Sequence, residues 1–211
     1  MPHKEISGIP SVTQILEVIS KPWLVRWYAV NGLDFCTKIR KESQEVGTRL
    51  HEVVYKFLQD GSEEGLSSYE KLLATEVKGW FVTNNLTILE MEPDTPYVSK
   101  RYGYQGTFDC IARDKKGRLY VIDFKATSTV SKLNALQLSA YGWLYLENKC
   151  DKKWKPIRGI IIQFRPASSK DSLIKVYKFY RMRWYFSIFR KVLHVYKFVT
   201  DYCGISYVNI L

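Results

Sequence analysis

The sequence predicts a single α/β domain, in which a mixed central β-sheet is flanked by helices. Its 211 residues suit one domain, spanning 1–211. Apolar residues recur with helical periodicity in residues 1–85, and strand-like runs interrupted by one helix fill residues 86–180. A basic helix is expected in residues 181–211. This order of elements is typical of a mixed sheet with helices packed around it.

Four helices are expected in the N-terminal part. Ser11 suits the cap of the first helix, and Pro22 suits the start of the second. The third helix carries an apolar stripe at helical spacing, and Gly61 ends it. The expected ranges are 12–19, 23–30, 45–58 and 67–82.

The sheet core is expected to contain six strands. The segment Asp114-Lys-Lys-Gly117 has the composition of a tight turn, so the strands on either side of it should form a β-hairpin. A helix over residues 132–146 separates this hairpin from the last two strands. The expected strands are 86–92, 97–102, 105–113, 118–126, 157–164 and 173–180.

Basic charge is concentrated in the last third of the chain. The protein has 32 Lys and Arg against 21 Asp and Glu. Residues 151–211 hold 13 of the basic and 3 of the acidic residues, a net charge of +10. This asymmetry favours a surface that binds a polyanion, with Arg181, Arg183 and Lys191 as contacts in the last helix. A solubilising surface, a membrane-surface helix and a subunit contact are the alternatives.

Neither a membrane span nor a secretory signal is expected. The sequence has no run of about 18 uncharged apolar residues, and residues 1–10 lack an apolar signal segment. Its four cysteines lie far apart, which excludes a zinc ribbon and favours reduced thiols. We therefore expect an intracellular, cytoplasmic protein.

Two charged residues, Asp123 and Lys125, interrupt an apolar strand. They are two residues apart, so their side chains point to the same face. Burying either charge alone is costly. Each side chain should therefore meet the other, a metal ion or water, and a buried ion pair without metal is one interpretation.

A further carboxylate, Asp109, lies in the preceding strand of the hairpin and can approach Asp123 across the two strands. Two close carboxylates repel each other unless a cation lies between them. Their oxygens are hard ligands suited to Mg²⁺ or Mn²⁺. A lysine such as Lys125, beside a metal-bound water, can orient it and offset negative charge that develops at phosphorus.

These residues resemble the core of the PD-(D/E)XK nuclease superfamily. Asp109, thirteen further residues and then Asp123-x-Lys125 match its motif, and the frame Gly103-Tyr-Gln-Gly-Thr-Phe-Asp109 is similar to the RecB-like exonuclease branch. The resemblance covers roughly residues 45–165 and implies a restriction-endonuclease-like core. The composition also resembles nucleases carried by archaeal viruses, which implies a host-cytoplasmic location.

The resemblance also implies further site residues. Gly47-Thr-Arg-Leu-His51 matches a helix that carries a metal-binding His, although a surface role for His51 is the alternative. The branch has an acid before the Gly-Tyr-x-Gly-Thr-x-Asp segment, where Glu92 fits best and Glu90 next. Gln137 and Tyr141, four residues apart, match its catalytic helix. Ordinary surface and core roles are the alternatives for these two.

Two departures from the family pattern limit what the resemblance implies. The CRISPR-associated adaptation members hold a four-Cys iron–sulfur cluster, and the cysteine spacing of this chain cannot form one, so we expect no iron–sulfur cluster. Ala126 stands where many members have Thr, although Thr127 follows.

We therefore expect a Mg²⁺- or Mn²⁺-dependent DNA nuclease that acts as an exonuclease or a structure-specific endonuclease. The resemblance implies metal ligands at His51, Glu92, Asp109 and Asp123, a water-positioning Lys125, and products with a 5′-phosphate and a 3′-hydroxyl. A catalytically silent nucleic-acid-binding protein on the same fold is the alternative. DNA is the expected partner and a membrane is not, while the oligomeric state, including a homo-oligomer, stays open.

Overall fold

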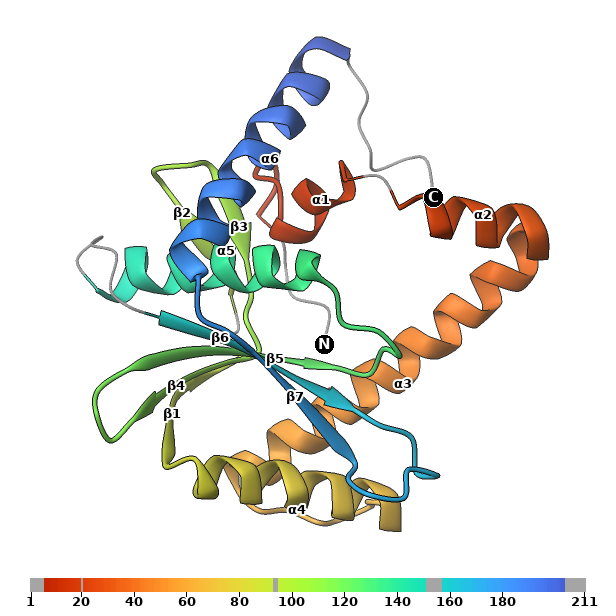
Figure 1. Ribbon diagram of the computed structural model, residues 1–211, viewed down its shortest axis with the longest axis vertical. Coiled ribbons are helices and arrows are strands. Elements are labelled where there is room, and N and C mark those ends of the chain that lie inside the picture. The colour runs from red at the N-terminus through yellow and green to blue at the C-terminus, as the bar shows by residue number, and fades with distance from the viewer. Residues whose placement is uncertain (1–5, 20, 93–94, 151–156, 204–211) are drawn as a thin grey trace.

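A five-stranded mixed sheet forms the centre of the protein. The computed structural model describes residues 6–19, 21–92, 95–150 and 157–203. The strand order is β1-β4-β5-β6-β7, in which only the β5–β6 pair is parallel (Figure 1). The strands are β1 (Leu86–Met91), β4 (Cys110–Asp114), β5 (Leu119–Lys125), β6 (Ile157–Phe164) and β7 (Ile174–Phe179). The prediction of an α/β domain with a mixed central sheet and flanking helices is confirmed.

The expectation of one continuous strand over residues 105–113 is wrong. β3 (Tyr104–Gly106) ends three residues before Asp109, and it pairs with β2 (Tyr97–Ser99) in a separate two-stranded sheet. The Gln105 side chain ties β3 to the N-terminal segment instead. The Ile6 N–H donates to Gln105 Oε1, and Gln105 Nε2 donates to the Ile6 carbonyl. Asp109 consequently lies in the connection between the two sheets.

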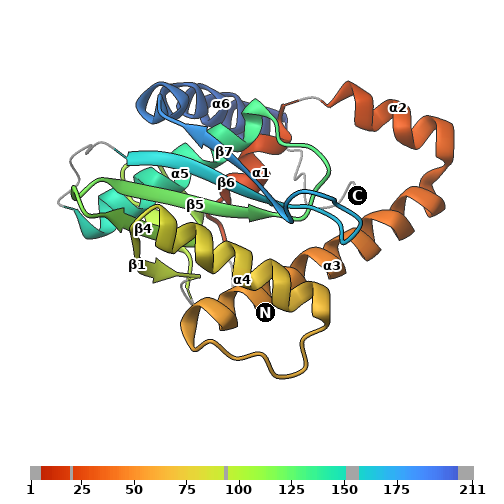
Figure 2. The same ribbon diagram turned by 60° about the horizontal axis from the view of Figure 1, so that its bottom comes forward.

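Helices cover both faces of the central sheet. Figures 1 and 2 show one helical layer on each side. The first layer contains α1 (Val12–Glu17), α5 (Lys132–Lys149) and α6 (Met182–Cys203). The second contains α3 (Leu33–Gln59) and α4 (Ser68–Thr83), while α2 (Pro22–Asn31) extends from the far end of α3. No helix within the described ranges is long and apolar enough to cross a membrane.

Helix α3 starts twelve residues earlier than expected. Its first half, 33–44, contains only one buried residue, Cys36. This half projects away from the sheet toward α2 (Figure 1). Because it does not pack on the sheet, it carries no continuous apolar stripe from which a helix could be predicted.

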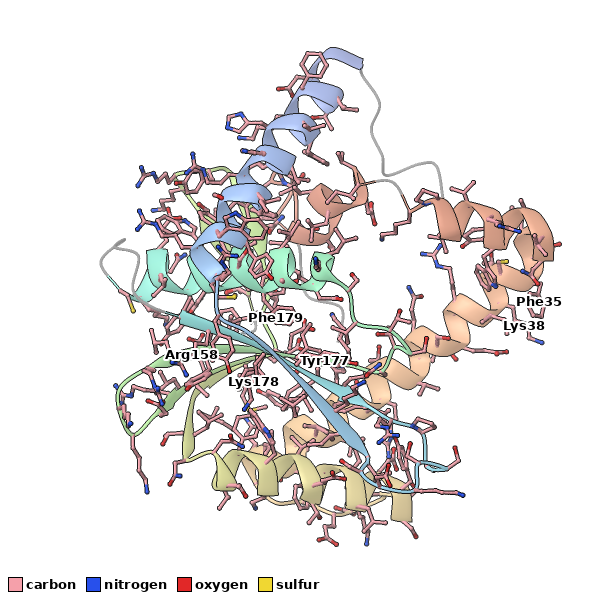
Figure 3. All side chains as sticks on the ribbon, in the orientation of Figure 1. Phe35, Lys38, Arg158, Tyr177, Lys178 and Phe179 are labelled. Atoms are coloured by element: carbon pink, nitrogen blue, oxygen red, sulfur yellow. The ribbon has the colours of Figure 1, made fainter. Side chains whose placement is uncertain are left out.

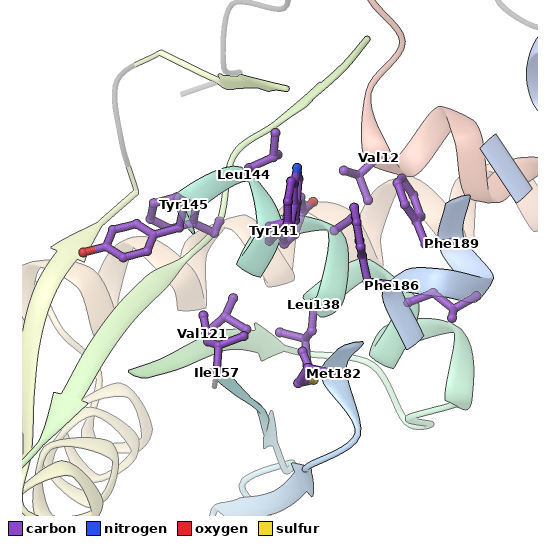
Figure 4. Close-up of a cluster of buried hydrophobic side chains, with 14 of the residues drawn as sticks. Val12, Val121, Leu138, Tyr141, Leu144, Tyr145, Ile157, Met182, Phe186 and Phe189 are labelled. Atoms are coloured by element: carbon purple, nitrogen blue, oxygen red, sulfur yellow. The ribbon is translucent and has the colours of Figure 1, made fainter. Parts of the chain in front are cut away.

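Alternation along β5 divides the core into two clusters, one on each face of the sheet. Val121 packs with α5 and α6, whereas Ile122 and Phe124 pack with α3 and α4. Figure 4 shows the first cluster, where Phe186 and Phe189 of α6 approach α5. Asp123 and Lys125 share the parity of Val121, so the strand directs them to the α5 side.

Candidate active site

Asp123 and Lys125 form an ion pair at the C-terminal end of β5. Lys125 Nζ lies 3.0 Å from Asp123 Oδ2 and donates a hydrogen bond to Oδ1 at 3.1 Å. The Asp123 side chain is 4% exposed and the Lys125 side chain 22%. Oδ2 is within ion-pair distance of Nζ but accepts no hydrogen bond. One fully buried carboxylate oxygen therefore has unused acceptor capacity.

The electrostatics of this pair depend on a third charge, Asp109. Burial raises the pKa of Asp123 to about 6; the Lys125 ammonium opposes the rise and Asp109 adds to it. Burial alone would lower the pKa of Lys125, but the carboxylates of Asp123 and Asp109 outweigh it and hold that pKa above its usual value. Lys125 therefore keeps its proton at neutral pH.

Asp109 lies beside Asp123 although it is outside the paired strand. The Phe124 backbone N–H donates to Asp109 Oδ2 at 2.6 Å. Because Cys110 pairs with Ile122, the residue before Cys110 lies opposite the residue after Ile122. Asp109 therefore lies close to Asp123, as predicted, but it belongs to the segment directly before β4, and its carboxylate is bound by the β5 backbone.

His51 reaches the same place from α3. Its Nδ1 lies 3.8 Å from Asp109 Oδ2. The imidazole makes edge contacts with the rings of Phe124 and Phe164, both with centroids 6.0 Å away, and these rings fix its position. Gly47, one turn earlier, lies over Ala126, where an added Cβ would be 3.8 Å from the alanine Cβ, an ordinary contact.

Gln137 and Tyr141 approach the ion pair from α5. Gln137 Nε2 donates to the Tyr141 hydroxyl at 3.1 Å. Burial raises the pKa of Tyr141 to about 12, and the charges of Asp123 and Lys125 act on the same hydroxyl. The predicted helical pair is therefore in place beside the carboxylates, with its phenol neutral at ordinary pH.

The two glutamates at the end of β1 differ in their surroundings. Glu90 accepts a hydrogen bond from the Tyr97 hydroxyl at 2.7 Å and lies 4.0 Å from Lys149 Nζ. The backbone N–H of Glu92 instead donates to the Asp109 carbonyl at 3.0 Å. Glu92 also has φ 35°, a left-handed conformation that is strained for a side chain of this type. The backbone of Glu92 is thus fixed next to Asp109, whereas the Glu90 side chain is held by Tyr97.

Sequence reasoning missed one buried polar residue near the site, Gln163. It pairs with Lys125 across β5 and β6, donates to the Thr127 carbonyl at 2.6 Å and accepts from the Tyr177 hydroxyl at 3.1 Å. Gln163 therefore holds the chain that leaves β5 directly after Lys125. The signal was a single polar residue near the end of the apolar run 157–164.

The donor set fits a hard divalent cation that keeps part of its water shell. Within the described ranges, no group of three or more His, Cys, Asp or Glu side chains is arranged to hold a metal ion by itself. Mg²⁺ commonly binds through only one or two carboxylates together with waters. Asp123, whose buried Oδ2 accepts no hydrogen bond, and the adjacent Asp109 could supply those two carboxylates.

The predicted nucleic-acid contacts lie on α6 and directly before it, away from this site. Arg181 and Arg183 are exposed at its start, and Lys191 is exposed further along it. Two other basic residues of α6 contact the β2–β3 turn instead, since Arg190 lies 5.2 Å from the Tyr102 ring and Lys197 donates to the Tyr102 carbonyl. Phe186, Phe189 and Leu193 of α6 are buried in the core of this chain, whereas Trp184, Val195 and Phe198 of the same helix are exposed.

Comparisons with known proteins yield a structural match but no family. No protein-family model matches the chain, and no curated protein matches it. A solved structure titled "Crystal structure of SSO0001" aligns over 98% of this chain and 87% of that one, with 18% sequence identity and a TM-score of 0.48.

Proposed function

We propose that the protein is a metal-dependent nuclease that hydrolyses phosphodiester bonds in DNA. The proposal is carried by the buried Asp123 carboxylate, of which one oxygen accepts no hydrogen bond although Lys125 and Asp109 lie beside it. A group that only stabilised the fold would be expected to have its hydrogen-bonding capacity used. Unused capacity next to a second carboxylate is typical of a cation site.

Asp109 and Asp123 would hold Mg²⁺ or Mn²⁺, with His51 and Glu92 as further ligands. When bound, the ion would supply Lewis acidity and a water of lowered pKa. His51 lies 3.8 Å from Asp109 and its ring is already fixed by two phenylalanines, so it could join without a large movement.

Lys125 would act as a fixed positive charge rather than as a base. Its raised pKa keeps it protonated, so it can donate to the attacking water or to a phosphoryl oxygen but cannot accept the proton of the water. In the reaction, the water oxygen bonds to phosphorus as the bond to the 3′ oxygen breaks. The water proton goes to solvent, and the 3′ oxygen takes a proton, which leaves a 5′-phosphate and a 3′-hydroxyl. Gln137 and Tyr141 would orient the phosphate from α5.

A nucleic-acid-binding protein that does not cut is the second candidate. One observation favours it: the Asp123–Lys125 pair is already neutralised without a metal, at 3.0 Å. In that case the acids would have a structural role, and α6 would carry the binding.

Cleavage of end-labelled DNA distinguishes the two candidates. Single-stranded, duplex and branched substrates should each be incubated with Mg²⁺, with Mn²⁺ and with EDTA. The nuclease proposal predicts metal-dependent products that end in a 5′-phosphate. DNA binding without products in either metal would support the second candidate instead.

A further inference from the structure

A hollow at the N-terminal end of β6 combines arginines with exposed aromatic rings. It has a volume of about 750 Å³, within the range of small-molecule sites. Arg158, Arg181 and Arg183 line it together with Tyr180 and Trp184. None of the described residues that line it is acidic, and three of them are arginines.

The two aromatic rings of this hollow are exposed to solvent, and each is in contact with an arginine guanidinium group. Tyr180 is 62% exposed and Trp184 is 50% exposed. The Arg158 guanidinium lies 5.3 Å from the centroid of the Tyr180 ring, and that of Arg181 lies 5.6 Å from the Trp184 ring. Planar guanidinium groups and aromatic rings are both surfaces on which nucleobases stack.

A smaller hollow of about 220 Å³ continues this surface. It shares Arg158 and Tyr180 with the first and adds Trp80 and Lys178. Its acidic residue, Asp114, is paired with Arg118 at 2.6 Å, so Arg158 and Lys178 still contribute net positive charge. The two hollows together provide room for more than one nucleotide.

This surface is separate from the candidate active site. It begins where Leu119 pairs with Ile157, whereas Lys125 pairs with Gln163 six residues further along the same two strands, roughly 20 Å away. On α6, Phe186, Phe189 and Leu193 are buried in the core, while Trp184 is exposed among three arginines, which favours a polyanion over the apolar interior of a membrane. Paired bases in a duplex do not present free faces for stacking, whereas unpaired bases do.

We propose that this surface binds an unpaired nucleic-acid strand, with bases stacked on Trp184 and Tyr180 and phosphates bound by Arg158, Arg181 and Arg183. The proposal rests on the proposed function only for the identification of the polyanion as nucleic acid. It deepens that function, because it specifies a substrate with a single-stranded part.

Binding without cleavage tests the proposal on the full-length chain. Fluorescence anisotropy should be measured in EDTA with labelled oligothymidylate, oligouridylate and a blunt duplex. Loss of one stacked base predicts that Trp184→Ala raises Kd for the single strand roughly 5- to 100-fold, while duplex binding changes little. Trp184→Phe should retain most of the affinity. The two single strands establish whether DNA, RNA or both are bound.

Phe35→Ala is the matched control, because Phe35 is 53% exposed and lies with Lys38 at the opposite side of the molecule from Arg158 and Lys178 (Figure 3). It should leave Kd unchanged. Equal single-strand affinity in Trp184→Ala and wild type would overturn the proposal, and so would binding only to anionic lipid vesicles. If the protein cuts DNA with metal but Trp184→Ala leaves Kd for the single strand unchanged, only this inference is refuted. If Trp184→Ala raises that Kd as expected but the protein never cuts, only the nuclease proposal is refuted.

Discussion

The ring of Tyr141 lies so close to Gly106 that a Cβ atom on Gly106 would come within 2.8 Å of Tyr141 Cε1. The same Cβ would lie 3.2 Å from Val12 and 3.3 Å from Leu144, so the ring has little room to move aside. Gly106 therefore determines how deeply Tyr141 sits in the core, and through it the position of the phenol beside Lys125.

Gly106→Ala should destabilise the protein by roughly 1–3 kcal/mol, because the added methyl overpacks this contact. Thermal unfolding measures the loss. Gly79→Ala is the control: Gly79 lies within α4 with nothing within 4 Å of an added Cβ, so alanine there should stabilise the protein by about 0.5–1 kcal/mol. An equal gain at both positions would show that the Gly106–Tyr141 contact is not tight.

Asp123→Asn should abolish Mn²⁺ binding in calorimetry and destabilise the metal-free protein. The variant leaves the Lys125 ammonium largely buried without its partner at 3.0 Å, which costs up to about 3 kcal/mol. Because the double variant Asp123→Asn with Lys125→Met removes both charges, it should recover most of the lost stability. Wild-type Mn²⁺ affinity in Asp123→Asn would place the metal elsewhere.

Glu70 should make stability pH-dependent at acid pH. Arg49 donates to it at 2.7 Å and the Ser67 N–H at 2.8 Å, and these contacts lower the pKa of Glu70 from 4.5 to about 2. Its contribution is therefore complete above pH 4.5 and is lost as the pH falls toward 2. Glu70→Gln should cost roughly 1–2 kcal/mol at neutral pH, and its difference from wild type should shrink in urea unfolding as the pH is lowered. Glu64→Gln, at an exposed position, should show no such trend.

Replacing Arg181, Arg183 and Lys191 with Gln should weaken DNA binding and flatten its dependence on salt. Each lost phosphate contact reduces the slope of log K against log salt by about 0.9 on duplex DNA, so the slope should fall by up to about three. Gln at exposed Lys38, Lys41 and Lys115, which removes the same three charges, is the control for net charge. If the α6 variant keeps the wild-type slope, its basic residues do not contact phosphate.

The parts of the fold that could be predicted have local signals. Turn residues marked the β4–β5 hairpin, and the apolar run 157–164 matches β6 at both ends. Asp123 and Lys125 could be recognised because they interrupt an apolar strand, and the ion pair confirms that they share one face.

The parts that could not be predicted depend on contacts between distant segments. β3 is separated from β4 because Gln105 bonds the N-terminal segment. Its partner there, Ile6, is 99 residues away in sequence. The hollow formed by Arg158 and Trp184 exists only because α6 returns to the start of β6. Neither arrangement leaves a pattern in the local sequence.

Single-turnover cleavage of saturating DNA by Lys125→Ala tests the central claim most directly. Lys116→Ala is the control, since Asp114-x-Lys116 has the same spacing but Lys116 lies exposed in the hairpin turn. The account predicts that Lys125→Ala cuts at least about 100-fold more slowly in Mg²⁺ or Mn²⁺ while it still binds DNA, because one positive donor at the reacting phosphate is lost. Lys116→Ala should cut normally. Cleavage by Lys125→Ala at the wild-type rate would contradict the assignment of the Asp123–Lys125 pair as the catalytic centre.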